Sequence, residues 1–203
     1  MITTKRPHFK QTVGAQYICF ATGIDPLVYD SDVEKSETVK NISTTENTES
    51  SKVYASGKVY ATSNQTSDIE VSTEVIAFVV ATLAKMKGES VGAGGLVKSG
   101  NGERPFFAYG KTVILSDGVV RLEWFPKCQL TANTDDVSTS EGSFSEQTDT
   151  LTISAMPYDD KNIKTYVQSD MEEFPEGLTE DKFFAKPILT DADLVAAAGG
   201  EGA

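Results

Sequence analysis

The segment Gly92–Ser99, GAGGLVKS, comes closest in this chain to the residue types and spacing of a chemical motif. A phosphate-binding P-loop has the pattern G-x-x-x-x-G-K-[ST], and its second glycine lets backbone N–H groups close around a phosphate. Val97 stands where that glycine is needed, and the segment follows an expected helix instead of a strand. We therefore interpret this segment as a flexible connector without nucleotide chemistry.

The other residues that could act in catalysis or metal binding are isolated or lie in turns. His8 is the one histidine, and nothing around it predicts an orienting partner, so we interpret it as a surface residue. Acidic pairs such as Asp135/Asp136 lack the spacing of a calcium loop and fit turn chemistry. Cys19 and Cys128 lie far apart in apolar strand patterns, which predicts free buried thiols. We predict no catalytic, cofactor-binding or metal-binding residue and no cofactor, and therefore no enzyme.

The charge of the chain argues against a protein that binds nucleic acid tightly. Its 203 residues carry a formal net charge of −12, whereas phosphate neutralisation by basic side chains supplies most of the affinity for DNA. An acidic surface suits ordinary solubility, and it also suits a surface along which DNA slides without sticking. No segment has the length of a transmembrane helix, and the apolar run near the N-terminus is too short for a signal peptide. We expect a soluble protein made in the cytoplasm.

The segment Arg104–Pro157 contains three strands with alternating side chains. Ser116-Asp117-Gly118 is expected to join Lys111–Leu115 to Val119–Thr131 as a β-hairpin. A period of two predicts that every second residue of Val119–Thr131 lies on one apolar face, with Trp124 in the core. These residues are Val120, Leu122, Trp124, Cys128 and Leu130, and a third strand follows with Leu151, Ile153 and Ala155.

Further strands are expected on the N-terminal side. Gly14–Thr22 and Asp68–Val75 read as strands, and the second of them alternates apolar with acidic residues. Lys52–Thr62, KVYASGKVYAT, repeats one unit around Ser56-Gly57, which predicts a hairpin or a kinked strand with Gly57 at the bend. Asp30–Ser51 is polar throughout and fits either a loop or a long strand exposed on both faces.

Helical patterns are few. Glu74–Lys87 places Ile76, Val79, Val80 and Leu83 on one stripe, and Gly88 suits the position after a helix end. Leu178–Ala185 is expected to form a short second helix, and the glycine-rich Leu194–Ala203 to be a flexible tail.

These elements predict a mainly β (α+β) fold, an antiparallel β-sandwich or barrel with one flanking α-helix and with extended loop and terminal arms. Residues 1–13 form an N-terminal arm, and residues 14–157 form a β domain with its helix at about 74–87. Residues 158–203 form a C-terminal extension with a short helix at 178–185 and a flexible tail.

The order of these segments resembles the major tail proteins, or tail tube proteins, of long-tailed bacteriophages, specifically the phi13-type family. The resemblance covers most of Gly14–Pro187, whereas the glycine-rich loop after the helix is longer than expected and the tail beyond Leu194 has no counterpart. The segments that carry it are VYASGKVYAT, an acidic alternating strand, a helix, PFFAYGKTVI, WFPKCQL, FSEQTDTLTISAMP and LTEDKFFAKP.

The resemblance implies a structural virion protein with two packed antiparallel sheets and a flanking helix. Six copies would form a ring, and head-to-tail stacked rings would form the tail tube of a flexible, non-contractile tail. Its partners would be further copies, the tape measure protein and the tail terminator or distal tail proteins. Phage DNA would pass through the lumen without specific binding. The charge of −12 and the acidic residues on polar strand faces, such as Glu70 and Glu74, predict that this lumen is acidic. The tube would be assembled in the host bacterial cytoplasm without any membrane.

Two other classes of protein remain open at this point. One is a soluble β-domain that binds a ligand or a cell-surface carbohydrate, such as an adhesin or a receptor-binding module. The lack of a compact aromatic cluster weakens it. The other is an enzyme, which the lack of a base–nucleophile pair weakens.

Overall fold

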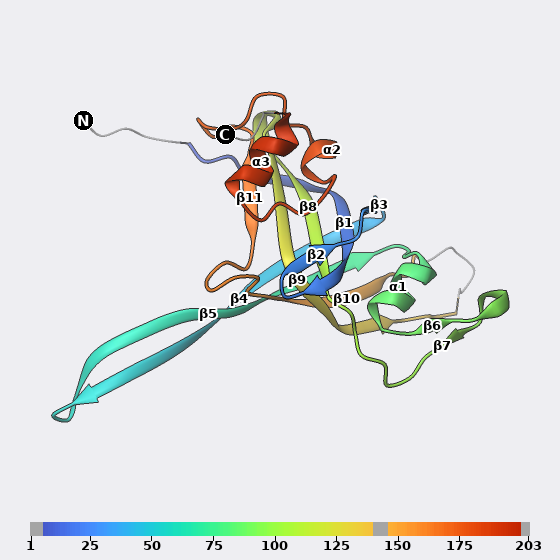
Figure 1. The fold of residues 1–203 in the computed structure, drawn as a ribbon, viewed down its shortest axis with the longest axis horizontal. Coiled ribbons are helices and arrows are strands. Elements are labelled where there is room, and N and C mark those ends of the chain that lie inside the picture. The colour runs from blue at the N-terminus through green and yellow to red at the C-terminus, as the bar shows by residue number, and fades with distance from the viewer. Residues whose placement is uncertain (1–5, 140–145, 200–203) are drawn as a thin grey trace.

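Alternating apolar and polar residues build most of the chain into antiparallel strands. The computed structural model describes residues 6–139 and 146–199 (Figure 1). The main nine-stranded sheet has the order β2-β1-β8-β9-β10-β5-β4, with β3 paired to β1 and β11 paired to β9. The predicted mainly β fold with few helices is thus confirmed.

The bounds of the elements are as follows. The main sheet contains β1 (Lys10–Ile24), β2 (Leu27–Tyr29), β3 (Glu34–Ser36), β4 (Val39–Ala55), β5 (Lys58–Val75), β8 (Phe107–Leu115), β9 (Val120–Asp135), β10 (Asp149–Met156) and β11 (Thr165–Gln168). The small sheet contains β6 (Ser90–Val91) and β7 (Val97–Lys98), and the α-helices are α1 (Val80–Met86), α2 (Glu180–Phe183) and α3 (Asp191–Ala198).

The predicted hairpin of β8 and β9 is confirmed, but the prediction of a single apolar face along β9 is wrong. Phe107 pairs with Cys128, whereas Tyr109 pairs with Phe125, so β9 carries one extra residue at Pro126. Proline cannot donate a ladder hydrogen bond, and such a bulge bends the strand and re-aims its side chains. Side chains before Pro126 and after it therefore alternate out of phase.

The first hydrophobic core lies inside the curl of the main sheet, and α1 packs against it. Phe125 belongs to this core and is fully buried, so it faces neither solvent nor a partner. The buried members are Ile18, Phe20, Ile69, Val71, Met86, Phe107, Tyr109, Phe125, Cys128, Leu130, Leu151, Ile153, Ala155 and Ile163.

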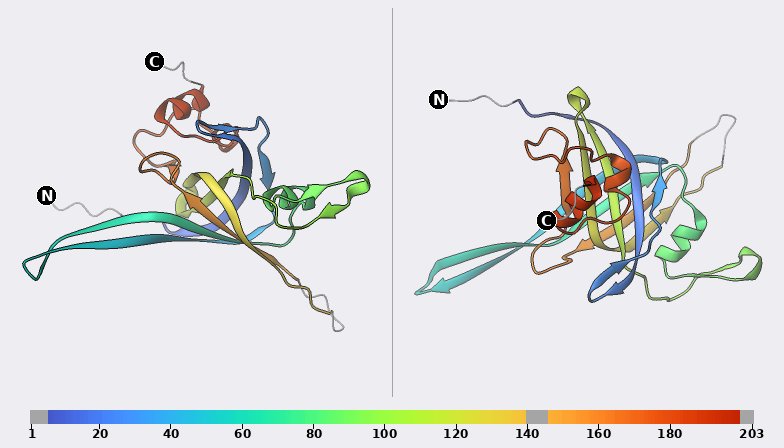
Figure 2. Two further views of the ribbon diagram at one scale, coloured as in Figure 1. Left: turned by 60° about the horizontal axis from the view of Figure 1, so that its bottom comes forward. Right: turned by 45° about the horizontal axis from the view of Figure 1, so that its top comes forward.

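The second core lies on the outer face of β1, β8 and β9, where the C-terminal segment covers the sheet (Figure 2). Trp124 is fully buried there, as predicted, and its indole Nε1–H donates to the carbonyl of Phe183 at 3.1 Å. The Phe184 ring stacks on Tyr17 with centroids 3.7 Å apart and meets Trp124 edge-on. A Cβ at Gly110 would lie 2.7 Å from Phe184, so only glycine allows the rings this close.

The predicted helix over 74–87 begins too early. Strand β5 continues to Val75, which pairs with both Val39 and Asp149, and α1 starts only at Val80. The β-branched residues before α1 favour the extended backbone, and no side chain caps the helix. Val79 and Val80 are exposed, while Thr82, Ala84 and Met86 are buried on another face.

The C-terminal extension is part of the folded body over residues 158–199. Strand β11 pairs with β9, and Phe183, Phe184 and Ile188 are buried in the second core. The prediction of a flexible tail from Leu194 is wrong over 194–198, because these residues lie in α3, where Thr190 and Asp193 form a reciprocal capping box at the start of the helix. Residues 200–203 lie outside the described residues.

We predict that Trp124→Ala lowers the free energy of unfolding by about 3–5 kcal/mol, the range for emptying a buried aromatic site. Urea unfolding measures this loss when it is monitored by circular dichroism, a signal that does not depend on tryptophan fluorescence. Trp124→Phe, which leaves a smaller gap, serves as the control and retains most of the stability. Unchanged unfolding combined with lost assembly would instead place Trp124 in an interface.

Candidate assembly surfaces

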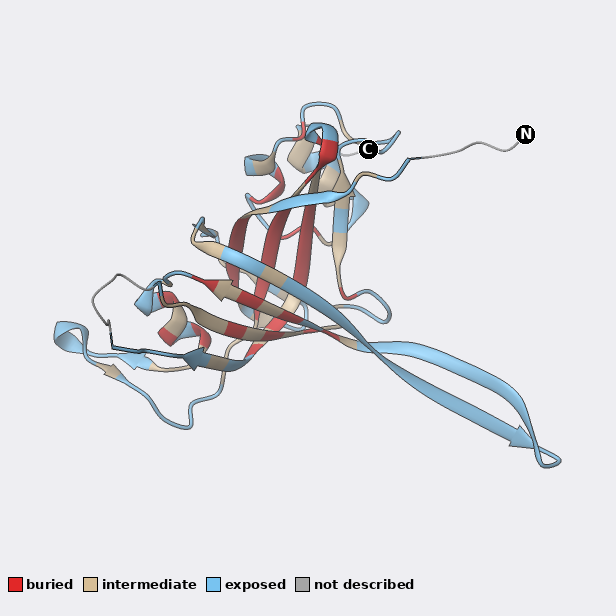
Figure 3. Ribbon diagram, turned by 180° about the vertical axis from the view of Figure 1, so that it is seen from behind, coloured by how far each residue is buried: buried red, intermediate tan, exposed pale blue. Residues whose placement is uncertain are grey.

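The hairpin of β4 and β5 extends far beyond the body of the protein (Figures 1 and 3). Strand β10 pairs with β5 only over Ile69–Val75, so the ribbon from about Asn47 outward has no third strand. At about 3.3 Å per residue, its nine residues from Asn47 to Ala55 span about 25–30 Å. The polar segment Asp30–Ser51 is thus mostly strand, which settles the alternative left open by the sequence.

The tip of this hairpin carries apolar and aromatic side chains in solvent. Ser56 and Gly57 form a two-residue turn with positive φ angles of 51° and 76°, the geometry that suits tight hairpins. Tyr54 and Tyr60 are 66% and 79% exposed, and Val53 and Val59 beside them are also exposed. A two-stranded ribbon is marginal in water by itself, so this surface is suited to contact with another molecule.

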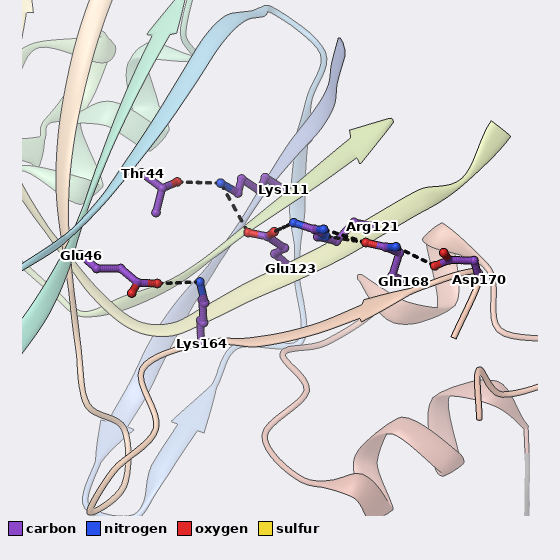
Figure 4. Close-up of polar contacts among 8 residues, drawn as sticks. All are labelled: Thr44, Glu46, Lys111, Arg121, Glu123, Lys164, Gln168 and Asp170. Carbon is purple, nitrogen blue, oxygen red and sulfur yellow. Dashed lines mark hydrogen bonds and ion pairs between the residues drawn. The ribbon is translucent and has the colours of Figure 1, made fainter. Parts of the chain in front are cut away.

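A network of polar side chains anchors the root of the hairpin to the sheet (Figure 4). The Lys111 ammonium donates to Thr44 Oγ1 on β4 at 2.7 Å and lies 3.4 Å from the Glu123 carboxylate on β9. Lys164 Nζ donates to Glu46 Oε1 at 2.9 Å. Burial lowers the pKa of Lys111, and the negative charge of Glu123 opposes that effect.

The network continues from Glu123 toward the C-terminal segment. Arg121 lies 3.7 Å from Glu123, and its guanidinium donates twice to Gln168 Oε1, at 2.9 and 2.7 Å. Gln168 donates in turn to Asp170 at 2.6 Å (Figure 4). The same Asp170 lies 3.4 Å from His8 Nε2, so His8 is half-buried beside an acidic side chain, whereas the sequence indicated no partner for it.

A cleft of about 630 Å³ lies beside this network, between the start of β1, the first half of β4 and the faces of β8 and β9. We call it the basic cleft, because five cations and two carboxylates line it. The sequence did not reveal this cleft, since its charges come from four strands and one loop. The charged residues are Lys10, Lys40, Lys111, Arg121, Lys164, Glu46 and Glu123.

The glycine-rich segment after α1 forms a small hairpin of its own, away from any helix start. Ser90 pairs with Lys98 and Val91 with Val97, and Gly94 and Gly95 turn the chain with positive φ angles. Part of the predicted flexible connector is thus a β-hairpin, and a P-loop geometry is absent from this described segment.

The remaining sequence-predicted residues lie apart from one another. Cys19 and Cys128 are free and buried, as predicted, and burial raises the pKa of the Cys19 thiol to about 11. Glu70 is exposed on β5, and Glu74 lies 4.0 Å from Lys40. Over residues 6–139 and 146–199 the structure has no group of three or more side chains suited to hold a metal ion. No helix in the same ranges is long and apolar enough to cross a membrane.

The chain belongs to the phage tail tube protein family, because the model of that family matches residues 20–190 of the chain. This match confirms the resemblance drawn from the order of segments, and it makes the chain a structural component of a phage tail and of the virion.

Two further comparisons add little. No curated protein matches the sequence of the chain significantly. A chain in the cryo-EM structure of the anti-feeding prophage (AFP) baseplate, 6-fold symmetrised, has 11% sequence identity and a TM-score of 0.41, covering 82% of this chain and 97% of that chain. We draw no argument from this distant likeness.

We predict that Lys98→Ala leaves assembly and melting temperature unchanged, because Lys98 is exposed on the small hairpin and closes no phosphate site. Differential scanning fluorimetry with and without ATP or GTP measures the effect on both stability and binding. A nucleotide-dependent shift in the parent protein that disappears in Lys98→Ala would contradict this expectation.

Proposed function

We propose that the chain self-assembles into rings, of six copies as the family resemblance implies, which stack head to tail into the tail tube. The observation that carries this proposal is the β4–β5 hairpin, whose exposed tip has no packing partner among the described residues of its own chain. Head-to-tail contacts form closed rings when the rotation closes, and a repeated axial contact extends them into a tube. Burying Tyr54, Tyr60 and their neighbours in such contacts accounts for their exposure in the single chain.

The proposal extends to the setting of the tube. Copies of this chain assemble in the host bacterial cytoplasm, contact the tape measure protein inside and meet terminator or distal tail proteins at the ends. The tail is flexible and non-contractile, and phage DNA passes through the lumen during ejection. The family resemblance supports these steps, and the projecting hairpin supports an extended set of contacts between copies.

We predict that shortening the hairpin abolishes tubes without unfolding the subunit. Thr48 pairs with Thr66, so an Asn-Gly turn placed directly between them removes the tip and keeps the anchored root. The expected product is a folded monomer with an unchanged melting temperature, seen by negative-stain microscopy and sedimentation. If this variant still formed normal tubes, the outer part of the hairpin would not belong to the interface between copies.

A milder variant tests the apolar tip itself. Tyr54→Ser/Tyr60→Ser should raise the critical concentration for assembly by roughly 100-fold or more, since each buried aromatic side chain contributes about 1.5–3 kcal/mol. Val195→Ser, an exposed position on α3, is the matched control and should assemble as the parent protein does. If Val195→Ser raised the critical concentration as much as the double tyrosine variant, the effect would reflect general solubility instead of a contact made by the tip.

We further predict that assembled tubes do not retain duplex DNA, even at low salt where electrostatic attraction is strongest. A lining with the net acidic character of the chain, −12 per copy, keeps the duplex centred by repulsion over about 8–10 Å at physiological salt. Filter binding of labelled duplex to purified tubes measures retention. Clear binding at low salt would contradict a lining that does not hold DNA.

A further inference from the structure

The basic cleft is a positive surface in an acidic protein. Its lining carries a net charge of +3, whereas the whole chain carries −12. Four smaller clefts have linings that are neutral or carry one net negative charge. The basic cleft therefore has the charge to attract a negatively charged ligand.

Lys40 of the cleft pairs with Glu146, which lies outside the lining, at 3.2 Å. The two carboxylates of the lining do not balance the four other cations. Glu123 lies between Lys111 and Arg121, at 3.4 and 3.7 Å, so two cations share one carboxylate. Glu46 is engaged by Lys164. Side chains of Lys111 and Glu123 are about nine-tenths buried, so their charges are weakly screened by water and act strongly on a bound anion.

The end of β9, the start of β10 and the described residues next to them form an acidic counterpart, which we call the acidic arm (Thr131–Thr139 and Glu146–Asp149). Glu146 of this arm is already paired with Lys40 of its own chain, at 3.2 Å, which leaves the aspartates of the arm for a neighbouring copy. It leaves the body on the side opposite to the β4–β5 hairpin (Figures 1 and 2). Asp135 and Asp149 are directly paired across the two strands, and Asp136 follows at once. Like charges opposite each other destabilise a strand pair, so a cation from outside would relieve this arrangement.

We propose that the acidic arm of one copy binds in the basic cleft of a neighbouring copy, with Asp135 and Asp136 facing Lys10 and Lys164. This inference rests on the proposed self-assembly and names two surfaces that make contact in it. The charges are complementary, and a cleft of about 630 Å³ has room for several side chains of an extended segment. Strand β4 forms one wall and pairs only with β5 among the described strands, which leaves it an edge to which an extended segment can add.

A second copy fits the cleft better than nucleic acid does. Glu46 and Glu123 line the cleft and would repel a phosphate backbone, whereas an acidic arm can place its few carboxylates between them. Because arm and cleft are different surfaces, the contact is head-to-tail and can repeat from copy to copy.

Reciprocal charge reversal tests the contact. The cleft variant Lys10→Glu/Lys164→Glu and the arm variant Asp135→Lys/Asp136→Lys should each raise the critical concentration for assembly by roughly tenfold or more, as loss of attraction turns into repulsion. Mixing the two restores assembly, because the unaltered arm of the first variant fits the unaltered cleft of the second, and the two reversed surfaces also match. Sedimentation and negative-stain microscopy of the single and mixed proteins measure this rescue.

Matched controls carry the same charge changes elsewhere. Lys98→Glu/Lys161→Glu and Glu172→Lys/Glu173→Lys change exposed residues outside cleft and arm, and both should assemble as the parent protein does. Circular dichroism checks that each subunit is folded. The neutral pairs Lys10→Gln/Lys164→Gln and Asp135→Asn/Asp136→Asn introduce no new repulsion, and they should also raise the critical concentration if a reversed variant fails to fold.

Several results would overturn the contact. Parent-like assembly of the folded cleft variant, or of its neutral form, would do so, as would a mixture of folded variants that stays unassembled. Duplex DNA retained by the parent protein and lost by the cleft variant, with assembly unchanged, would reassign the cleft to nucleic acid. A parent protein that forms no rings or tubes would instead contradict the proposed function itself.

Discussion

The bend of β9 at Pro126 is the constraint on which the rest of the fold depends. Before the bend, β9 pairs with β8 and β11. After it, β9 pairs with β10 and keeps one pair with β8, Cys128 with Phe107. The extra residue sends Trp124 to the outer core and Cys128 to the inner core. One strand therefore has both faces buried, and a single continuous sheet encloses one core and supports another. The C-terminal segment covers the outer core with Phe183, Phe184 and Ile188.

The polar network at the hairpin root links this body to the surfaces proposed for assembly. Lys111 and Glu123 lie on β8 and β9, close to the bend, and Lys111 binds Thr44 at the base of the hairpin. Removing one partner of a buried ion pair leaves an unpaired charge and costs several kcal/mol. The direction of the hairpin is thus fixed by groups held in the rigid part of the sheet. The same groups form the floor of the basic cleft, so the two surfaces keep a constant position relative to each other.

Local sequence patterns predicted which elements form better than they predicted where the elements end or which strands pair with each other. Alternation identified β10 and the last part of β5, and turn residues identified the hairpin of β8 and β9. The bulge at Pro126 was missed because a change of phase depends on the pairing partner Phe107, which period-two counting ignores. The sequence pattern placed the start of α1 too early. The pairing of Val75 with two strands stabilises the extended backbone more than the apolar stripe favours a helix. The capping box of Thr190 and Asp193 was readable in the sequence, yet the small residues after it obscured it.

The surfaces proposed for assembly were harder to predict, because their residues come together only in three dimensions. The KVYA repeat predicted a turn at Gly57, but not that its tyrosines stay exposed. The basic cleft combines residues more than 150 positions apart, Lys10 and Lys164, which no local window can relate.

The apolar tip and the charged surfaces proposed for assembly would contribute differently to the free energy of association. An isolated ribbon would lose conformational freedom on binding, and that loss opposes association. The anchored root and the tight Ser56-Gly57 turn restrict the hairpin before any contact forms. In the proposed assembly, apolar burial at the tip would supply affinity, while charge complementarity between cleft and arm would select the orientation of the incoming copy. Because the cleft and the arm are different surfaces, a copy would add in one direction only, as the proposed head-to-tail tube requires.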